Sequence, residues 1–174
     1  MKEENVKKMY KFLEDLESGS LEIVIEQYPE RLEDVIQTAV SYKRKGDYDS
    51  AISTYFLLFE SEKNANCDIL VYFYKVLIAS CDFYAAYRII CAAEKEVIKQ
   101  KGEYSTLMSP WGTPMGFVPW LQSDHKNRLL EAMHDAAKGN TTTLREYCKA
   151  ASGNPKYECP LTDGRIKFIA WNYF

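Results

Sequence analysis

A short turn sequence that occurs twice, 35 residues apart, restricts this chain to a small set of helical architectures. Residues 46–52 read Gly-Asp-Tyr-Asp-Ser-Ala-Ile, and residues 81–87 read Cys-Asp-Phe-Tyr-Ala-Ala-Tyr. Each copy lies between segments whose apolar residues recur at helical spacing. Gly46 can adopt a positive φ after one helix, and Asp47 can cap the helix that follows. The pattern therefore predicts two helix–turn–helix units in tandem.

The repeat resembles the tetratricopeptide family, whose units are helical hairpins of about 34 residues. At the positions where that family has Trp, Leu, Gly, Tyr, Ala, an aromatic residue and Ala, the first copy has Val35, Thr38, Ala39, Tyr42, Ala51, Tyr55 and Leu58. The second copy has Leu70, Phe73, Tyr74, Leu77, Ala86, Ile90 and Ala93. Tyr74 departs from the family, which has a small residue there, and Lys63 replaces a closing proline. The resemblance covers residues 30–101 and implies a stack of hairpins that binds a peptide or protein on its concave side.

Helical spacing over most of the remaining chain predicts a mainly α fold with about seven helices in a single domain, 1–174. Residues 3–17 should form an amphipathic helix, 21–28 a short second helix, and 121–152 a further helical hairpin. The tail has a different pattern. Residues 157–161 and 165–174 flank Thr-Asp-Gly, a sequence typical of a β-turn, which predicts a short β-hairpin over 156–174.

Residues 102–120 interrupt the helical pattern with three prolines and three glycines, yet they contain Trp111 and Trp120. Such a segment cannot be a regular helix over most of its length. Two interpretations remain open. The segment packs over the end of the repeats, or it is a loop that binds a partner through its aromatic side chains.

Charge and cysteine content exclude several classes of protein. The net charge is −3, which gives no electrostatic reason to expect nucleic-acid binding. No apolar run is long enough to cross a membrane, and the N-terminus has no apolar signal core. Five cysteines without framework spacing favour reduced thiols, and hence a cytoplasmic protein. The charge is also uneven, because residues 1–34 have 5 basic and 10 acidic side chains whereas residues 125–174 have 8 and 5.

No motif for phosphate binding, zinc proteolysis or nucleophilic catalysis is present. The residues able to bind a metal are two histidines, at 125 and 134, and cysteines such as Cys148 and Cys159, but they lack the short paired spacing of zinc sites. We therefore expect no metal, no cofactor and no enzymatic activity.

The tetratricopeptide resemblance places the candidate binding surface on the first helix of each repeat. Its apolar floor would be formed by Ile36, Val40, Val71 and Ile78, and its basic edge by Lys43, Arg44 and Lys75, with Trp111 and Trp120 added if the aromatic loop binds the partner. This surface suits a non-enzymatic adaptor that binds a protein or peptide. A second hypothesis is a small inhibitor, of the immunity type or encoded by a phage, that blocks a target enzyme. It also remains open that the C-terminal segment fills the groove.

Overall fold

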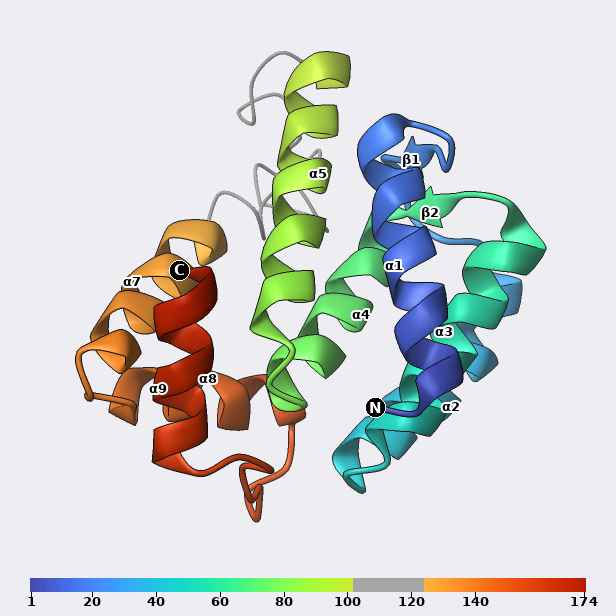
Figure 1. Ribbon diagram of the computed structural model, residues 1–174. Coiled ribbons are helices and arrows are strands. Elements are labelled where there is room, and N and C mark those ends of the chain that lie inside the picture. Colours follow the sequence, from blue (N-terminus) through green and yellow to red (C-terminus); the bar gives the residue numbers. More distant parts are fainter. Residues whose placement is uncertain (102–123) are drawn as a thin grey trace, which may run out of the picture.

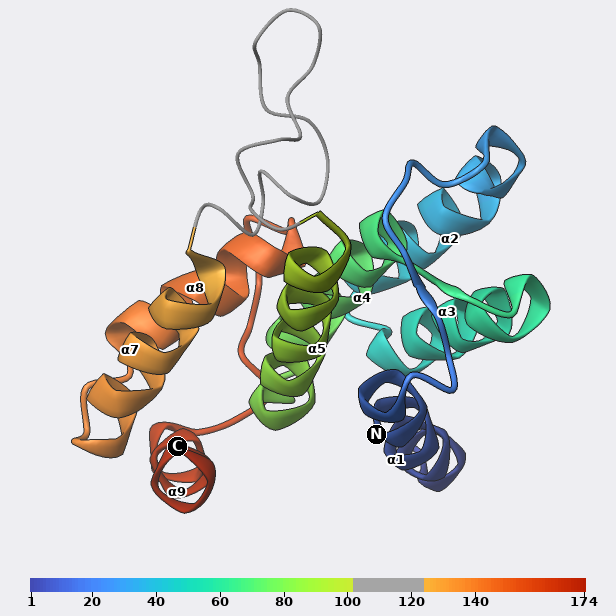
Figure 2. The same ribbon diagram turned by 90° about the horizontal axis from the view of Figure 1, so that it is seen from above.

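The computed structural model describes residues 1–101 and 124–174, and their helices form three layers (Figures 1 and 2). The back layer contains α2 (Glu33–Arg44), α4 (Cys67–Ala79) and α8 (Thr142–Ser152). The middle layer contains α3 (Tyr48–Glu62), α5 (Phe83–Lys101) and α7 (His125–Ala137). In the front layer α1 (Glu3–Ser18) contacts α3 and α5, and α9 (Asp163–Tyr173) packs on α7. The prediction of a mainly α fold is confirmed.

The two predicted turns have the same hydrogen bonds, 35 residues apart. In each, a residue with positive φ donates its N–H to the carbonyl three residues earlier, and the next residue donates to the carbonyl five earlier. The N···O distances are 3.0 and 2.9 Å for the turn at Gly46, and 3.0 and 2.8 Å for the turn at Cys81. Asp47 caps α3 by accepting from the N–H of Ser50 at 3.2 Å, as predicted. The turns that join α2 to α3 and α4 to α5 therefore have the same backbone geometry.

A third hairpin, α7–α8, closes the array with the reverse order of layers. Its turn has the same pattern, with Gly139 at φ 103° and N···O distances of 3.0 and 2.9 Å. The first two hairpins start in the back layer, whereas this one starts in the middle layer with α7 and ends in the back layer with α8. As a result, α8 packs along α4 and α7 lies against α5.

Phe73 of α4 lies at the centre of the core. Its side chain is fully buried, and four aromatic rings surround it with centroids 5.4–5.8 Å away: Phe12, Tyr55, Phe56 and Phe59. Edge-to-face contacts of this kind add to the stabilisation from burial alone. Phe12 comes from α1, so the same cluster fixes the front layer onto the repeats.

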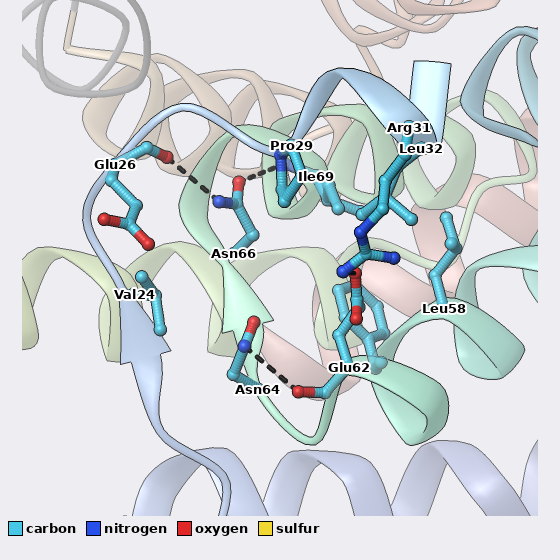
Figure 3. Close-up of a pocket in the computed structure, with 11 residues that line it drawn as sticks. Val24, Glu26, Pro29, Arg31, Leu32, Leu58, Glu62, Asn64, Asn66 and Ile69 are labelled. Carbon is cyan, nitrogen blue, oxygen red and sulfur yellow. Dashed lines mark hydrogen bonds and ion pairs between the residues drawn. The ribbon is translucent and has the colours of Figure 1, made fainter. Parts of the chain in front are cut away.

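The short helix predicted for residues 21–28 is wrong. Ile23–Val24 form a strand, β1, that pairs in parallel with β2, Ala65–Asn66. The N–H of Ala65 donates to the carbonyl of Glu22 at 2.7 Å, and the Asn66 amide donates to the carbonyl of Glu26 at 2.9 Å (Figure 3). Backbone pairing with a distant segment thus outweighed a weak local helix pattern. The pocket beside these strands has a volume of only about 80 Å³, too small for a ligand beyond a few waters.

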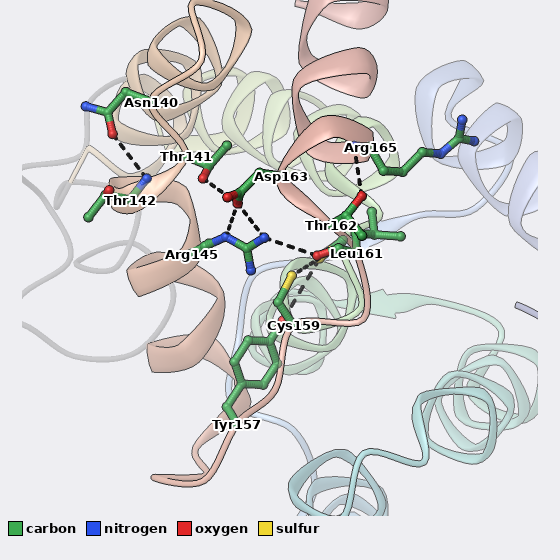
Figure 4. Close-up of polar contacts among 11 residues, drawn as sticks. Asn140, Thr141, Thr142, Arg145, Tyr157, Cys159, Leu161, Thr162, Asp163 and Arg165 are labelled. Atoms are coloured by element: carbon green, nitrogen blue, oxygen red, sulfur yellow. Dashed lines mark hydrogen bonds and ion pairs between the residues drawn. The ribbon is translucent and has the colours of Figure 1, made fainter.

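The β-hairpin predicted for the tail is also wrong, because Asp163–Tyr173 form the helix α9. The described ranges thus contain eight α-helices and one 3₁₀ turn, Glu30–Leu32, which precedes α2. Thr162 caps α9 by accepting from the N–H of Arg165 at 3.3 Å. The carboxylate of Asp163 accepts from the Thr141 hydroxyl at 2.8 Å and from Nε of Arg145 at 2.5 Å (Figure 4). Thr-Asp-Gly therefore begins a helix instead of making a β-turn, and contacts with α7 and α8 stabilise it.

The repeat packing predicts that larger side chains are not tolerated at the small residues near each turn. Ala51 and Ala86 are fully buried. We expect Ala51→Leu and Ala86→Leu each to lower the free energy of unfolding by about 1–3 kcal/mol, because the extra atoms must displace a neighbouring helix. Urea denaturation measures this. Ala150→Leu on the exposed face of α8 is the matched control and should leave the midpoint nearly unchanged; equal midpoints for all three variants would contradict the assigned packing.

Candidate functional site

The predicted concave groove is not a surface, and this prediction is corrected by the structure. Ile36 and Ile78 are fully buried and Val40 is 6% exposed, so all three belong to the hydrophobic core. Lys43 is buried as well, and its Nζ donates to the carbonyl of Ala151 in α8 at 2.7 Å. These four residues therefore do not form an exposed surface on which a partner could bind.

The other predicted site residues do not gather into a site. Val71 and Lys75 are half-buried on α4. Arg44 is exposed, and its backbone carbonyl accepts from the side-chain amide of Asn154 at 3.0 Å, which fixes the segment after α8. Trp111 and Trp120 lie outside the described residues.

A chain of polar side chains joins α7 and α8 to α4. Nδ1 of His125 lies 2.8 Å from the hydroxyl of Tyr147, which lies 3.0 Å from the hydroxyl of Tyr74. Burial lowers the pKa of His125, which favours its neutral form. Tyr74, which stands where the tetratricopeptide family has a small residue, thus forms a hydrogen bond with Tyr147 of the hairpin α7–α8. Within residues 1–101 and 124–174, no group of three or more His, Cys, Asp and Glu side chains is arranged to hold a metal ion.

A cleft of about 460 Å³ lies where the two repeat turns meet the N-terminus and the start of α9. Three carboxylates line it, but each is already used by the fold. Asp47 caps α3, and Asp82 caps α5 by accepting from the N–H of Ala85 at 3.4 Å. Asp49 accepts from the N–H of Lys2 at 2.8 Å. The cleft therefore offers no free acidic set for chemistry.

Four of the nine large hydrophobic side chains that are exposed in the described ranges lie on α9 and the first turn of α5. Phe168 and Trp171 are three residues apart, so they lie on one side of α9, and we call this side the α9 face. Trp171, at 76%, is the most exposed of the nine. Tyr173 points to another side of α9, where its ring stacks on that of Tyr84. Such clustering marks interaction surfaces, whereas single exposed apolar residues do not.

The α9 face is held in position by ring stacking and carries positive charge. The rings of Tyr84 and Tyr173 stack with centroids 5.1 Å apart, so the end of α9 is fixed to α5. The guanidinium of Arg165 lies over the ring of Phe168 at 5.2 Å, and that of Arg88 over Tyr84 at 5.4 Å. Arg88 also pairs with Glu17 of α1.

Sequence reasoning missed this surface because it assigned residues 165–174 to a strand. On a strand Phe168 and Trp171 point to opposite faces, whereas on a helix their spacing of three places them on one face. The signal that could have found it is the spacing of Ile166 and Ala170, which are buried one turn apart.

Searches of protein-family models, of curated proteins and of solved structures found no match to this chain. Membership of the tetratricopeptide family therefore stays a prediction. None of the helices in the two described ranges has the length and apolar content needed to cross a membrane.

Burial of Lys43 predicts a measurable pH dependence. Burial, with smaller contributions from Lys75 and Arg44, lowers the pKa of Lys43 from 10.5 to about 8. Between these values the unfolded chain binds more protons than the folded one, so the contribution of Lys43 to stability rises with pH. From pH 7.5 to 10, the free energy of unfolding of the wild type should rise relative to Lys43→Met by about 2 kcal/mol.

Urea denaturation of both proteins at several pH values tests this expectation. Lys45→Met, at an exposed position, is the control and should run parallel to the wild type. A Lys43→Met curve that also runs parallel would mean that α8 does not bury the ammonium group.

Proposed function

We propose that this protein is a non-enzymatic protein-interaction module that binds a protein partner through the α9 face. The observation that carries the proposal is the pair of exposed rings, Phe168 and Trp171, on one side of α9, with the Arg165 guanidinium over the Phe168 ring. Tryptophan and arginine are among the residues that dominate the energetics of known interfaces, and the α9 face has both. Free cysteines at all five positions support a cytoplasmic location.

Rigidity supports the same assignment. The stack of Tyr84 on Tyr173, and the contact of Phe174 with Tyr87 at 5.5 Å between ring centroids, fix the C-terminal turn of α9. The carboxylate of Asp163 fixes its N-terminal turn through Arg145 and Thr141. A surface already held in its binding conformation loses less conformational entropy when a partner docks.

The charge around the α9 face indicates the chemistry of the partner. Arg165 and Lys167 flank the aromatic rings, and the one acidic residue of α9, Asp163, is engaged by Arg145. The segment 125–174 has 8 basic and 5 acidic side chains. A complementary partner would offer apolar side chains surrounded by carboxylates, either on a helix or on a folded surface.

The nature of the partner decides whether this protein acts as an adaptor or as an inhibitor. If the partner is an enzyme and loses activity on binding, the protein acts as an inhibitor. If its activity is unchanged, the protein is an adaptor.

The decisive variant is Trp171→Ala. Because Trp171 is exposed, its removal should change the free energy of unfolding by less than about 0.5 kcal/mol. The affinity for the partner should fall by on the order of 30-fold, as expected for a hot-spot residue. Affinity purification of the tagged protein from its native cells, followed by mass spectrometry, identifies the partner, and titration of the purified pair measures the affinity.

Leu57→Ala is the matched control, because Leu57 is a 60% exposed apolar residue on α3, outside the α9 face. Arg165→Glu should weaken binding further at low salt than at high salt if the partner is acidic. A partner bound equally well by wild type and Trp171→Ala would contradict the proposal. If Trp111→Ala or Trp120→Ala abolishes capture instead, the binding surface is the segment 102–120.

A further inference from the structure

Cys81 occupies a backbone position where the other two hairpin turns have glycine. The same pair of turn hydrogen bonds occurs at Gly46, Cys81 and Gly139, and φ is 81°, 65° and 103° respectively. A residue with a Cβ is strained in this left-handed region, whereas glycine is not. Backbone strain of this kind is often retained because the side chain is needed. We therefore expect the side chain of Cys81 to have a role besides forming the turn.

The thiol of Cys81 is in contact with a second thiol from a distant part of the chain. Its Sγ lies 3.4 Å from the Sγ of Cys159, in the segment between α8 and α9. This separation is within van der Waals contact, and a movement of somewhat more than 1 Å would bring the sulfurs to bonding distance. The two cysteines are 78 residues apart in the sequence.

The segment that carries Cys159 is fixed on both sides, so the contact between the thiols is built into the fold. Before Cys159, the hydroxyl of Tyr157 donates to the carbonyl of Ala79 at 2.7 Å, at the end of α4. After it, the carbonyl of Leu161 accepts from the Arg145 guanidinium at 3.2 Å (Figure 4). Cys159 is half-buried, and Cys81 borders the 460 Å³ cleft between the repeat turns and α9. A small oxidant can therefore reach the pair.

We propose that Cys81 and Cys159 form a reversible disulfide that joins the turn between α4 and α5 to the segment leading into α9. The oxidant is a low-molecular-weight disulfide such as oxidised glutathione. The thiolate of Cys159 attacks one sulfur of that disulfide, and one glutathione leaves as a thiolate. The thiolate of Cys81 then attacks Sγ of Cys159, the second glutathione leaves, and the two protons lost by the cysteines are taken up by the two glutathione thiolates. The protein pair is oxidised and one glutathione disulfide is reduced to two thiols.

The reaction should be slow, and this separates it from a fast peroxide sensor. Burial raises the pKa of Cys159, and contact with Cys148, together with burial, raises the pKa of Cys81. Both thiols are therefore largely protonated at neutral pH, and exchange depends on a small thiolate fraction. The contact between the sulfurs favours the intramolecular bond once the first exchange has occurred.

Cys148 is the internal comparison, because it also contacts Cys81 but is fully buried in α8. Cys67, in α4, is likewise buried, and its Sγ is directed to the carbonyl of Glu26. Neither has the half-exposed position that allows Cys159 to react first.

The experiment equilibrates the full chain with glutathione buffers of increasing oxidised fraction, blocks free thiols by alkylation at low pH, and maps disulfide-linked peptides by mass spectrometry. We expect a peptide pair joining Cys81 to Cys159 in the wild type and in Cys148→Ser. Cys159→Ser and Cys81→Gly should lack it. In oxidising buffer, the Tm of wild type and Cys148→Ser should be higher than in reducing buffer by on the order of 10 °C, because the bond closes a long loop. The Tm of Cys159→Ser should not depend on the buffer.

Cys81→Gly adds a second test of the argument, since glycine relieves the backbone strain at φ 65°. In reducing buffer its Tm should exceed that of Cys81→Ala, which loses the same buried thiol but keeps a Cβ at positive φ. A pair joining Cys81 to Cys148, or only mixed disulfides with glutathione at full oxidation, would overturn the proposal. So would an equivalent of zinc bound by the reduced wild type and lost in Cys159→Ser, because the thiols would then form a metal site.

Discussion

The whole arrangement depends on the need to surround α4 with protein. Nine of the thirteen residues of α4 are buried, and they occupy nearly all sides of the helix. A helix that is apolar all round cannot remain at a surface. The repeat partners α2, α3 and α5 cover part of it, and α1 contributes Phe12 to the ring cluster around Phe73. One side of α4 remains, which a longer array would cover with a further repeat. In this protein α8 covers that side.

Closure by α8 has consequences for where the protein can bind. It buries Lys43 and joins Tyr74 to Tyr147 by a hydrogen bond, so these two residues of the repeats are not available to a partner. The same closure carries the chain through the segment around Cys159 and delivers α9 to the front layer. The exposed aromatic residues of α9 are thus positioned by contacts whose origin lies in the burial of α4. Fold and proposed binding surface follow from one requirement.

The sequence was informative where local chemistry decides the conformation. The turn at Gly46, the cap at Asp47 and the hairpins on either side follow from glycine's tolerance of positive φ, capping and apolar spacing. The sequence was misleading where distant contacts decide. Ile23 and Val24 pair with Ala65 and Asn66 across 42 residues, and no local pattern encodes that partnership. Asp163 and Gly164 are compatible with both a β-turn and the start of a helix. The ion pair between Arg145 and Asp163 stabilises the helix. The binding groove was misplaced because an apolar helix face looks the same in sequence whether a partner or the chain's own helices cover it.

Native-state hydrogen exchange, followed by mass spectrometry at increasing urea concentrations, tests most directly whether α8 is an integral part of the core. If α8 closes the array, the interior amides of α8 around Leu144 and Cys148 should exchange with the same opening free energy as those of α4 around Phe73, since both become accessible only on global unfolding. Exchange of the α8 amides at low urea while α4 stays protected would show that α8 detaches from the repeats. In that case the side of α4 that α8 covers, with Tyr74, and the ammonium group of Lys43 would be accessible, and the account given for the binding surface would be wrong.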